Sequence, residues 1–189
     1  MAPDISEAVL EGDAYERATA LTRRVFPMSL TSKIRLCVLV LASTGLLAPA
    51  IAHRQALIAE LDPAGGTTPP ALVTVVALGS GVTFLFGLAF LRQRHVVRTR
   101  ELDFETAKQL VRFEDVLMTF TVSTGLLFVL VPLSLAIMGA VSSDAVVYLY
   151  QRDIRLYRPS GGSLATTARV SVGGLVLGAA LLVGEIATR

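Results

Sequence analysis

The stretch Ala71–Leu91, ALVTVVALGSGVTFLFGLAFL, contains no ionisable residue and is long enough to cross a membrane as one helix. A helix rises about 1.5 Å per residue, so about 20 apolar residues span the ~30 Å hydrocarbon core of a bilayer. Three further runs are similarly apolar: Ile34–Ala52, Val116–Val141 and Val170–Gly184. Their only ionisable residue is Arg35, at the start of the first. The sequence therefore predicts an all-α integral membrane bundle of four transmembrane helices.

The composition agrees with this fold class and limits the function. Hydrophobic residues make up 53% of the 189 residues and charged residues only 17%, which is too apolar for an ordinary soluble domain. The formal net charge of +2 does not indicate a nucleic-acid partner. Cys37 is the single cysteine, so an intrachain disulfide or a thiolate metal cluster is excluded.

The basic residues predict how the four helices are oriented. Lys and Arg are retained on the cytoplasmic side of multi-pass proteins. Eleven lie before or at the start of the first run, or between the second and third: Arg17, Arg23, Arg24, Lys33, Arg35, Arg92, Arg94, Arg98, Arg100, Lys108 and Arg112. The other two loops hold five: Arg54, Arg152, Arg155, Arg158 and Arg169. We expect a multi-pass protein of the cell membrane with both termini in the cytoplasm.

Residues 1–30 are expected to form a cytoplasmic amphipathic helix and a linker that precede the four-span membrane domain, residues 31–189. Asp4 is a candidate N-cap, and an apolar face follows it at helical spacing: Ile5, Val9, Leu10 and Ala14. Pro27 is expected to end this helix. The helix either lies against the membrane or a neighbour, or is simply solvated.

The charged segment 92–115 is expected to form the cytoplasmic loop between the second and third spans. Thr99 or Asp103 is a candidate cap for a helix that, if unbroken, runs from about residue 104 to 141. Such a helix would project into the cytoplasm as a docking surface or as a solvated charged face.

The external loop 142–169 concentrates tyrosine and arginine. Tyrosine favours the headgroup layer, so this segment is expected to lie along the outer interface. The same residues form a candidate partner surface: Tyr148, Tyr150, Arg152, Arg155 and Tyr157.

Small residues in the last span predict a helix-packing face. Gly174 and Gly178 are spaced by four residues, as are Ala180 and Gly184, and this spacing lets another backbone approach closely. The partner is either another span of the same chain or a second copy.

Hydroxyl groups in the second and third spans allow two interpretations. Ser80, Thr83, Thr119 and Ser123 recur at helical spacing. They either line a polar path or make polar contacts within and between helices. Pro49 and Pro132 each remove a backbone hydrogen bond and predict a kink in the first and third spans.

The sequence does not predict enzyme chemistry, a cofactor or a metal. His53 and His95 follow the outer end of the first span and the inner end of the second, so one subunit cannot use both on one metal or haem. Glu114 and Asp115 are adjacent, and adjacent helical positions point about 100° apart. They are not expected to converge on one reacting atom.

The leading hypothesis is a non-enzymatic integral membrane subunit that assembles with itself or with a larger membrane complex through its small-residue faces and loops. The alternative is an oligomeric channel or small-solute transporter lined by the hydroxyl residues of spans two and three. A third class, an enzyme acting on lipid, would need polar groups that converge at one membrane face. The preference for Arg over Lys suggests a prokaryotic source.

Overall fold

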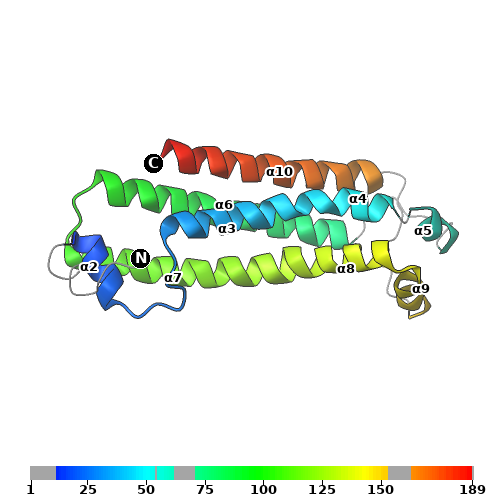
Figure 1. The fold of residues 1–189 in the computed structure, drawn as a ribbon, viewed down its shortest axis with the longest axis horizontal. Coiled ribbons are helices and arrows are strands. Elements are labelled where there is room, and N and C mark those ends of the chain that lie inside the picture. The colour runs from blue at the N-terminus through cyan, green and yellow to red at the C-terminus, as the bar shows by residue number, and fades with distance from the viewer. Residues whose placement is uncertain (1–11, 54, 62–70, 153–162, 189) are drawn as a thin grey trace.

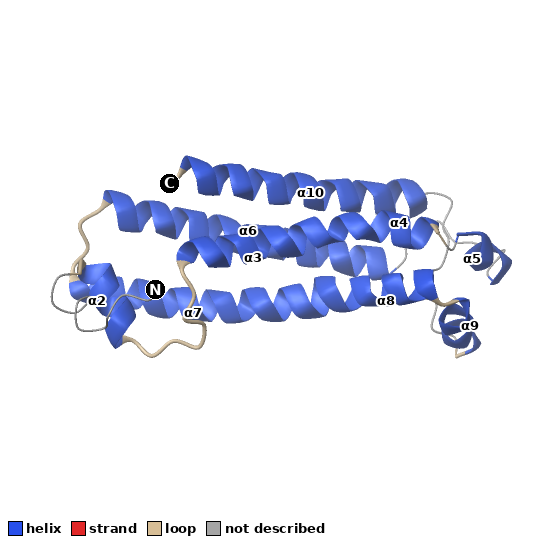
Figure 2. Cartoon of the chain, in the orientation of Figure 1, coloured by secondary structure: helices blue, strands red, loops and turns tan. Residues whose placement is uncertain are grey.

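The computed structural model describes residues 12–53, 55–61, 71–152 and 163–188. Within these ranges every regular element is a helix. The long helices form rods that lie side by side, with short helices at both ends of the bundle (Figures 1 and 2). The predicted all-α bundle is confirmed.

The four rods are helices long and apolar enough to cross a membrane, with mean hydropathies between 2.0 and 2.2. The first comprises α3 (Leu30–Ser43), the 3₁₀ turn η1 (Thr44–Leu46) and α4 (Leu47–Ala52). The second is α6 (Ala71–Thr99), and the fourth is α10 (Ser163–Ala187). The third comprises α7 (Phe104–Thr124), the π-helical segment η2 (Gly125–Leu130) and α8 (Val131–Val141). The chain is therefore a multi-pass membrane protein.

In the described ranges, three short helices lie outside the rods: α2 (Ala14–Leu21), α5 (Gln55–Leu61) and α9 (Ser143–Gln151). Helix α2 lies at the end of the bundle where α6 connects to α7 and where α10 ends, whereas α5 and α9 lie at the opposite end (Figure 1). We call the first the basic end, because the arginine-rich ends of α6 and α7 meet there, and the second the tyrosine end, after Tyr148 and Tyr150 of α9.

Two apolar clusters fill the bundle between the ends. The cluster nearer the basic end is built from all four rods: Ile34, Cys37, Leu41, Phe90, Leu117, Met118 and Leu181. The cluster nearer the tyrosine end joins the first three rods: Leu47, Ile51, Leu72, Val73, Val76, Leu133 and Ala136. Because lipid tails are as apolar as these side chains, close packing rather than exclusion of water holds the rods together.

The third rod is longer than the apolar run within it. The Asp103 carboxylate accepts a hydrogen bond from the Thr106 N–H and caps α7. Helix then continues to Val141, so the predicted helix from about 104 to 141 and its Asp103 cap are confirmed. Thr99 instead ends α6, and only residues 100–103 of the predicted loop 92–115 are non-helical.

Both predicted proline sites coincide with a change of helix type. The 3₁₀ turn η1 precedes Pro49, and the π-helical η2 ends two residues before Pro132. A proline lacks the N–H that bonds to the carbonyl four residues earlier, so the preceding turn must re-pair its carbonyls.

The segments outside the spans differ from expectation in three places. Helix α2 ends at Leu21, well before Pro27, and is capped by Asp13 through a capping box with Glu16. The predicted Asp4 cap and most of its apolar face lie outside the described residues. Residues 142–169, expected as a loop, contain α9 and the start of α10.

Candidate functional site: buried charge at the basic end

A buried ion pair joins the first and third rods at the basic end. Lys33 lies in the first turns of α3, and its Nζ pairs with Oε1 of Glu114 in α7. Both side chains are 0% exposed. Removing two charges from water costs several kcal/mol per ion, so such a pair persists only where further hydrogen bonds complete it.

Two other elements supply those hydrogen bonds. The Tyr15 hydroxyl of α2 donates to Glu114 Oε2 at 2.5 Å. Gln93 of α6 places its Nε2 3.4 Å from the same oxygen and donates to the Leu110 carbonyl at 3.0 Å. We call Tyr15, Lys33, Gln93 and Glu114 the Glu114 cluster. One carboxylate thus connects α2, α3, α6 and α7.

Tyr15 is held in its protonated form by this arrangement. Burial is the main cause that raises the pKa of its phenol far above the usual value, and the neighbouring Glu114 carboxylate adds to it. Because folding raises the pKa of Tyr15, its protonated hydroxyl contributes fully to the free energy of unfolding below the unfolded-state pKa of about 10. This contribution is lost only as pH rises through the folded-state pKa. Tyr15 therefore remains a hydrogen-bond donor throughout the physiological range.

A second buried carboxylate joins the first, second and fourth rods. Glu185 of α10 is fully buried, and its Oε1 lies 3.6 Å from Arg94 Nη1 and 3.7 Å from Arg35 Nη2. One turn further along each helix, Arg98 Nη1 donates to the Thr188 carbonyl at 2.5 Å. The guanidiniums of α6 therefore pair with the C-terminal end of α10.

Asp115 holds the linker that follows α2. Its carboxylate accepts hydrogen bonds from the Val25 N–H at 2.9 Å and from the Phe26 N–H at 3.0 Å. Glu114 and Asp115 therefore bind different groups, as their angular separation predicts. Together they fix α2 and its linker against α7, where Ala18 also packs on Ala107 and Val111.

The buried polar groups at the basic end hold the rods and α2 together. Each buried carboxylate is neutralised by a cation from another rod, and the Tyr15 proton is held by Glu114. A catalytic acid or base needs access to a substrate proton, whereas Lys33 and Glu114 are enclosed. The geometry supports a structural role for both pairs.

Three of the four predicted helix-packing residues face other rods of the same chain. A Cβ added at Gly174 would lie 1.8 Å from Thr44 Oγ1, and one at Gly178 would lie 3.5 Å from Leu41 Cβ. A Cβ at Gly184 would meet Leu91 of α6 at 2.8 Å. Ala180 is exposed and points away from this contact.

The four predicted hydroxyl residues separate into two groups. Ser80 and Thr83 are buried in α6 and donate to carbonyls of their own helix, Val76 at 2.7 Å and Gly79 at 2.8 Å. Thr119 and Ser123 are exposed on α7, and Thr119 donates to the Asp115 carbonyl at 3.0 Å. The structure does not bring the two groups together.

The predicted tyrosine–arginine surface is described only in part. Arg152 lies over the ring of exposed Tyr148, with its guanidinium carbon 4.7 Å from the ring centroid. Tyr150 packs against Val146 in the contact between α9 and α5. Arg155 and Tyr157 lie outside the described residues.

The buried charges were not predicted as a site, although their spacing from the core residues places them on the buried face of each helix. Lys33 lies four and eight residues before core residues Cys37 and Leu41, and Glu185 lies four residues after Leu181. Glu114 lies four residues before Met118. Helical spacing therefore places each charge on the core face, just beyond the apolar run that defines it. His53 and His95 lie at opposite ends, as predicted.

Tyr15→Phe is expected to release α2 from the bundle without unfolding the rods. A hydrogen bond to a charged group contributes about 1.5–3 kcal/mol, and this one joins α2 to α7. Hydrogen exchange should show faster exchange across Ala14–Leu21, with little change in α6 and α10. Tyr148→Phe, at the exposed tyrosine end, is the matched control, and equal exchange in the two variants would contradict the role of the Tyr15 bond.

No known protein family, curated protein or solved structure matches this chain.

Proposed function

We propose that this protein is a non-enzymatic integral membrane subunit that assembles with itself or with a larger membrane complex through the outward face of α7. In this proposal the basic end lies in the cytoplasm and the bundle in the cell membrane. The observation that carries the proposal is an aromatic and hydroxyl-bearing helix face that no rod of the described chain covers.

This outer α7 face consists of exposed residues that recur three and four positions apart: Phe113, Val116, Phe120, Ser123 and Leu127. Residues with this spacing share one side of a helix. Phe120, near the centre of the face, is 59% exposed. The face follows α7 and the start of η2 away from the basic end.

Three of the four small packing residues of α10 are already in contact with other rods, which favours another surface for assembly. Gly174 and Gly178 lie against α3, and Gly184 lies against α6. On α7, by contrast, the Ser123 hydroxyl faces outward among apolar side chains. Hydroxyl groups in lipid favour contacts with another helix, because acyl chains offer neither donors nor acceptors.

A channel lined by both groups of hydroxyl residues is less well supported. Ser80 and Thr83 are bonded to their own helix, and the apolar clusters around Phe90 and Val76 fill the interior near them. An oligomeric pore would have to be lined by Thr119 and Ser123 alone. Ion or solute flux in liposomes that is lost in Ser123→Leu would favour the channel over the subunit.

Cysteine cross-linking tests the assembly directly. In a Cys37→Ala background, Ser123→Cys is expected to form disulfide-linked dimers in membranes, since a bridge forms only where two Cβ atoms approach within about 4.5 Å. Val176→Cys, on the exposed side of α10, is the matched control and should remain monomeric. Native mass spectrometry in lipid discs then distinguishes a second copy from a different subunit. A lone monomer in discs, with no cross-link at either position, would contradict the proposal.

A further inference from the structure

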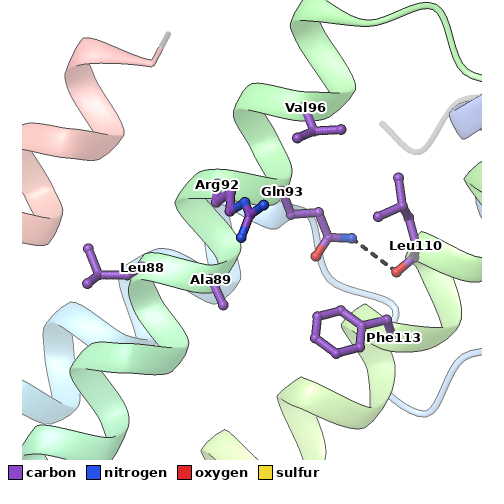
Figure 3. Close-up of a pocket in the computed structure, with 7 residues that line it drawn as sticks. All are labelled: Leu88, Ala89, Arg92, Gln93, Val96, Leu110 and Phe113. Carbon is purple, nitrogen blue, oxygen red and sulfur yellow. Dashed lines mark hydrogen bonds between the residues drawn. The ribbon is translucent and has the colours of Figure 1, made fainter.

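A groove opens between α6 and α7 at the basic end and shares only Phe113 with the outer α7 face. Its volume is about 490 Å³, within the range of small-molecule sites. The walls are apolar: Leu88, Ala89, Val96, Leu110 and Phe113. Arg92 and Gln93 are the two polar residues that line it, and Figure 3 shows both on α6, with Gln93 extending toward α7.

Gln93 offers this groove a buried acceptor. The side chain is only 5% exposed, and its Oε1 receives no hydrogen bond from any residue that the structure describes. The orientation of the amide is set by its other end, because Nε2 faces two acceptors, the Leu110 carbonyl and the Glu114 carboxylate. Figure 3 shows Oε1 on the side of the amide away from the Leu110 carbonyl. A buried acceptor without a donor costs about 1–3 kcal/mol, so a ligand that donates there would be favoured.

Arg92 determines the charge of the ligand. It is exposed and directly follows the apolar run that ends at Leu91, which places its guanidinium at the boundary of the hydrocarbon core. A carboxylate is not among the lining residues. The groove therefore presents one positive charge at headgroup depth, with apolar walls below it and a neutral acceptor beside it.

We propose that this groove binds a phospholipid whose anionic phosphate pairs with Arg92 and whose headgroup hydroxyl donates to Gln93 Oε1, as phosphatidylglycerol would. The acyl chains then lie along Leu88 and Phe113, which are both exposed to lipid. A zwitterionic headgroup is disfavoured because its cation would lie beside Arg92 without a carboxylate in the groove. The Gln93 amide, which accepts the hydrogen bond from this hydroxyl, is held in its orientation by the Glu114 cluster.

Native mass spectrometry of the full chain with defined lipids tests this assignment. Phosphatidylglycerol is expected to be retained about tenfold more than phosphatidylmethanol, which has the same charge and no hydroxyl, in line with one hydrogen bond to a buried acceptor. Phosphatidylcholine and phosphatidylethanolamine should bind more weakly than phosphatidylglycerol. Equal retention of all four lipids, the behaviour of a non-specific annulus, would overturn the proposal.

Variants separate the two contacts. Arg92→Gln is expected to remove the preference for anionic lipid, while Arg112→Gln, an exposed arginine of α7 outside the groove, keeps it. Gln93→Leu should bind phosphatidylglycerol no better than phosphatidylmethanol. Because Gln93 also supports the Glu114 cluster, Ala89→Phe serves as a second variant that fills the groove and leaves both polar residues in place. Unchanged phosphatidylglycerol retention in Arg92→Gln and Ala89→Phe would contradict the site.

Discussion

Glu114→Gln is expected to lower the free energy of unfolding by about 3–5 kcal/mol, the loss typical of removing one partner from a buried ion pair. Gln keeps the shape of the side chain and an acceptor for Tyr15, but it leaves Lys33 buried without a counter-charge. Equilibrium unfolding by SDS in mixed micelles, followed by circular dichroism, measures the change.

A double variant and a surface control isolate the charge. Lys33→Met combined with Glu114→Gln should recover most of the loss, because no uncompensated charge then remains. Glu105→Gln breaks an exposed pair with Lys108, in which Glu105 is 71% exposed and the two groups are 3.9 Å apart, so it should change stability by less than about 1 kcal/mol. A double variant as unstable as Glu114→Gln alone would show that the ion pair is not the cause.

Gly174→Ala is expected to destabilise the bundle by about 1–3 kcal/mol, as over-packing of a close contact does. The added methyl group would overlap Thr44 Oγ1 and lie 3.0 Å from the Leu41 carbonyl oxygen. The Thr44 hydroxyl donates to that same carbonyl at 2.7 Å, so it cannot move aside without losing the bond. Thermal unfolding in detergent, read as loss of helical signal, measures the effect.

Gly173→Ala is the matched control for this change. A Cβ at Gly173 meets nothing within 4 Å, although the residue is next to Gly174 in the same helix. The control should therefore retain the parent stability. Equal losses at Gly173 and Gly174 would indicate a general effect of glycine replacement and would count against the packing of α10 on α3.

The bundle could be predicted from the sequence because lipid imposes a simple rule on the chain. A segment without ionisable residues must satisfy its backbone groups internally, so Ala71–Leu91 has to be a helix. The Asp103 cap was also local, since it depends only on the Thr106 N–H three residues later. Such features need no knowledge of how the helices pack.

The buried ion pairs could not be predicted in this way, because they depend on how the helices pack, and residue spacing alone does not show that. Lys33 and Glu114 are distant in sequence, and the positive-inside rule explains Lys33 equally well as a solvated anchor. Gln93 lies beyond the end of an apolar run, so its role depends on the angle at which α6 meets α7. Likewise, spacing alone left it open whether Gly174 faces its own chain or a second copy.

The two ion pairs differ in when they can first form. Translation delivers the N-terminal helices first, so Lys33 can meet Glu114 while α10 is still to be made. Arg94, in contrast, must wait for Glu185, which arrives with the last of the four rods. Insertion of α10 therefore supplies the counter-ion for a guanidinium of α6 after the Lys33–Glu114 pair is already able to form.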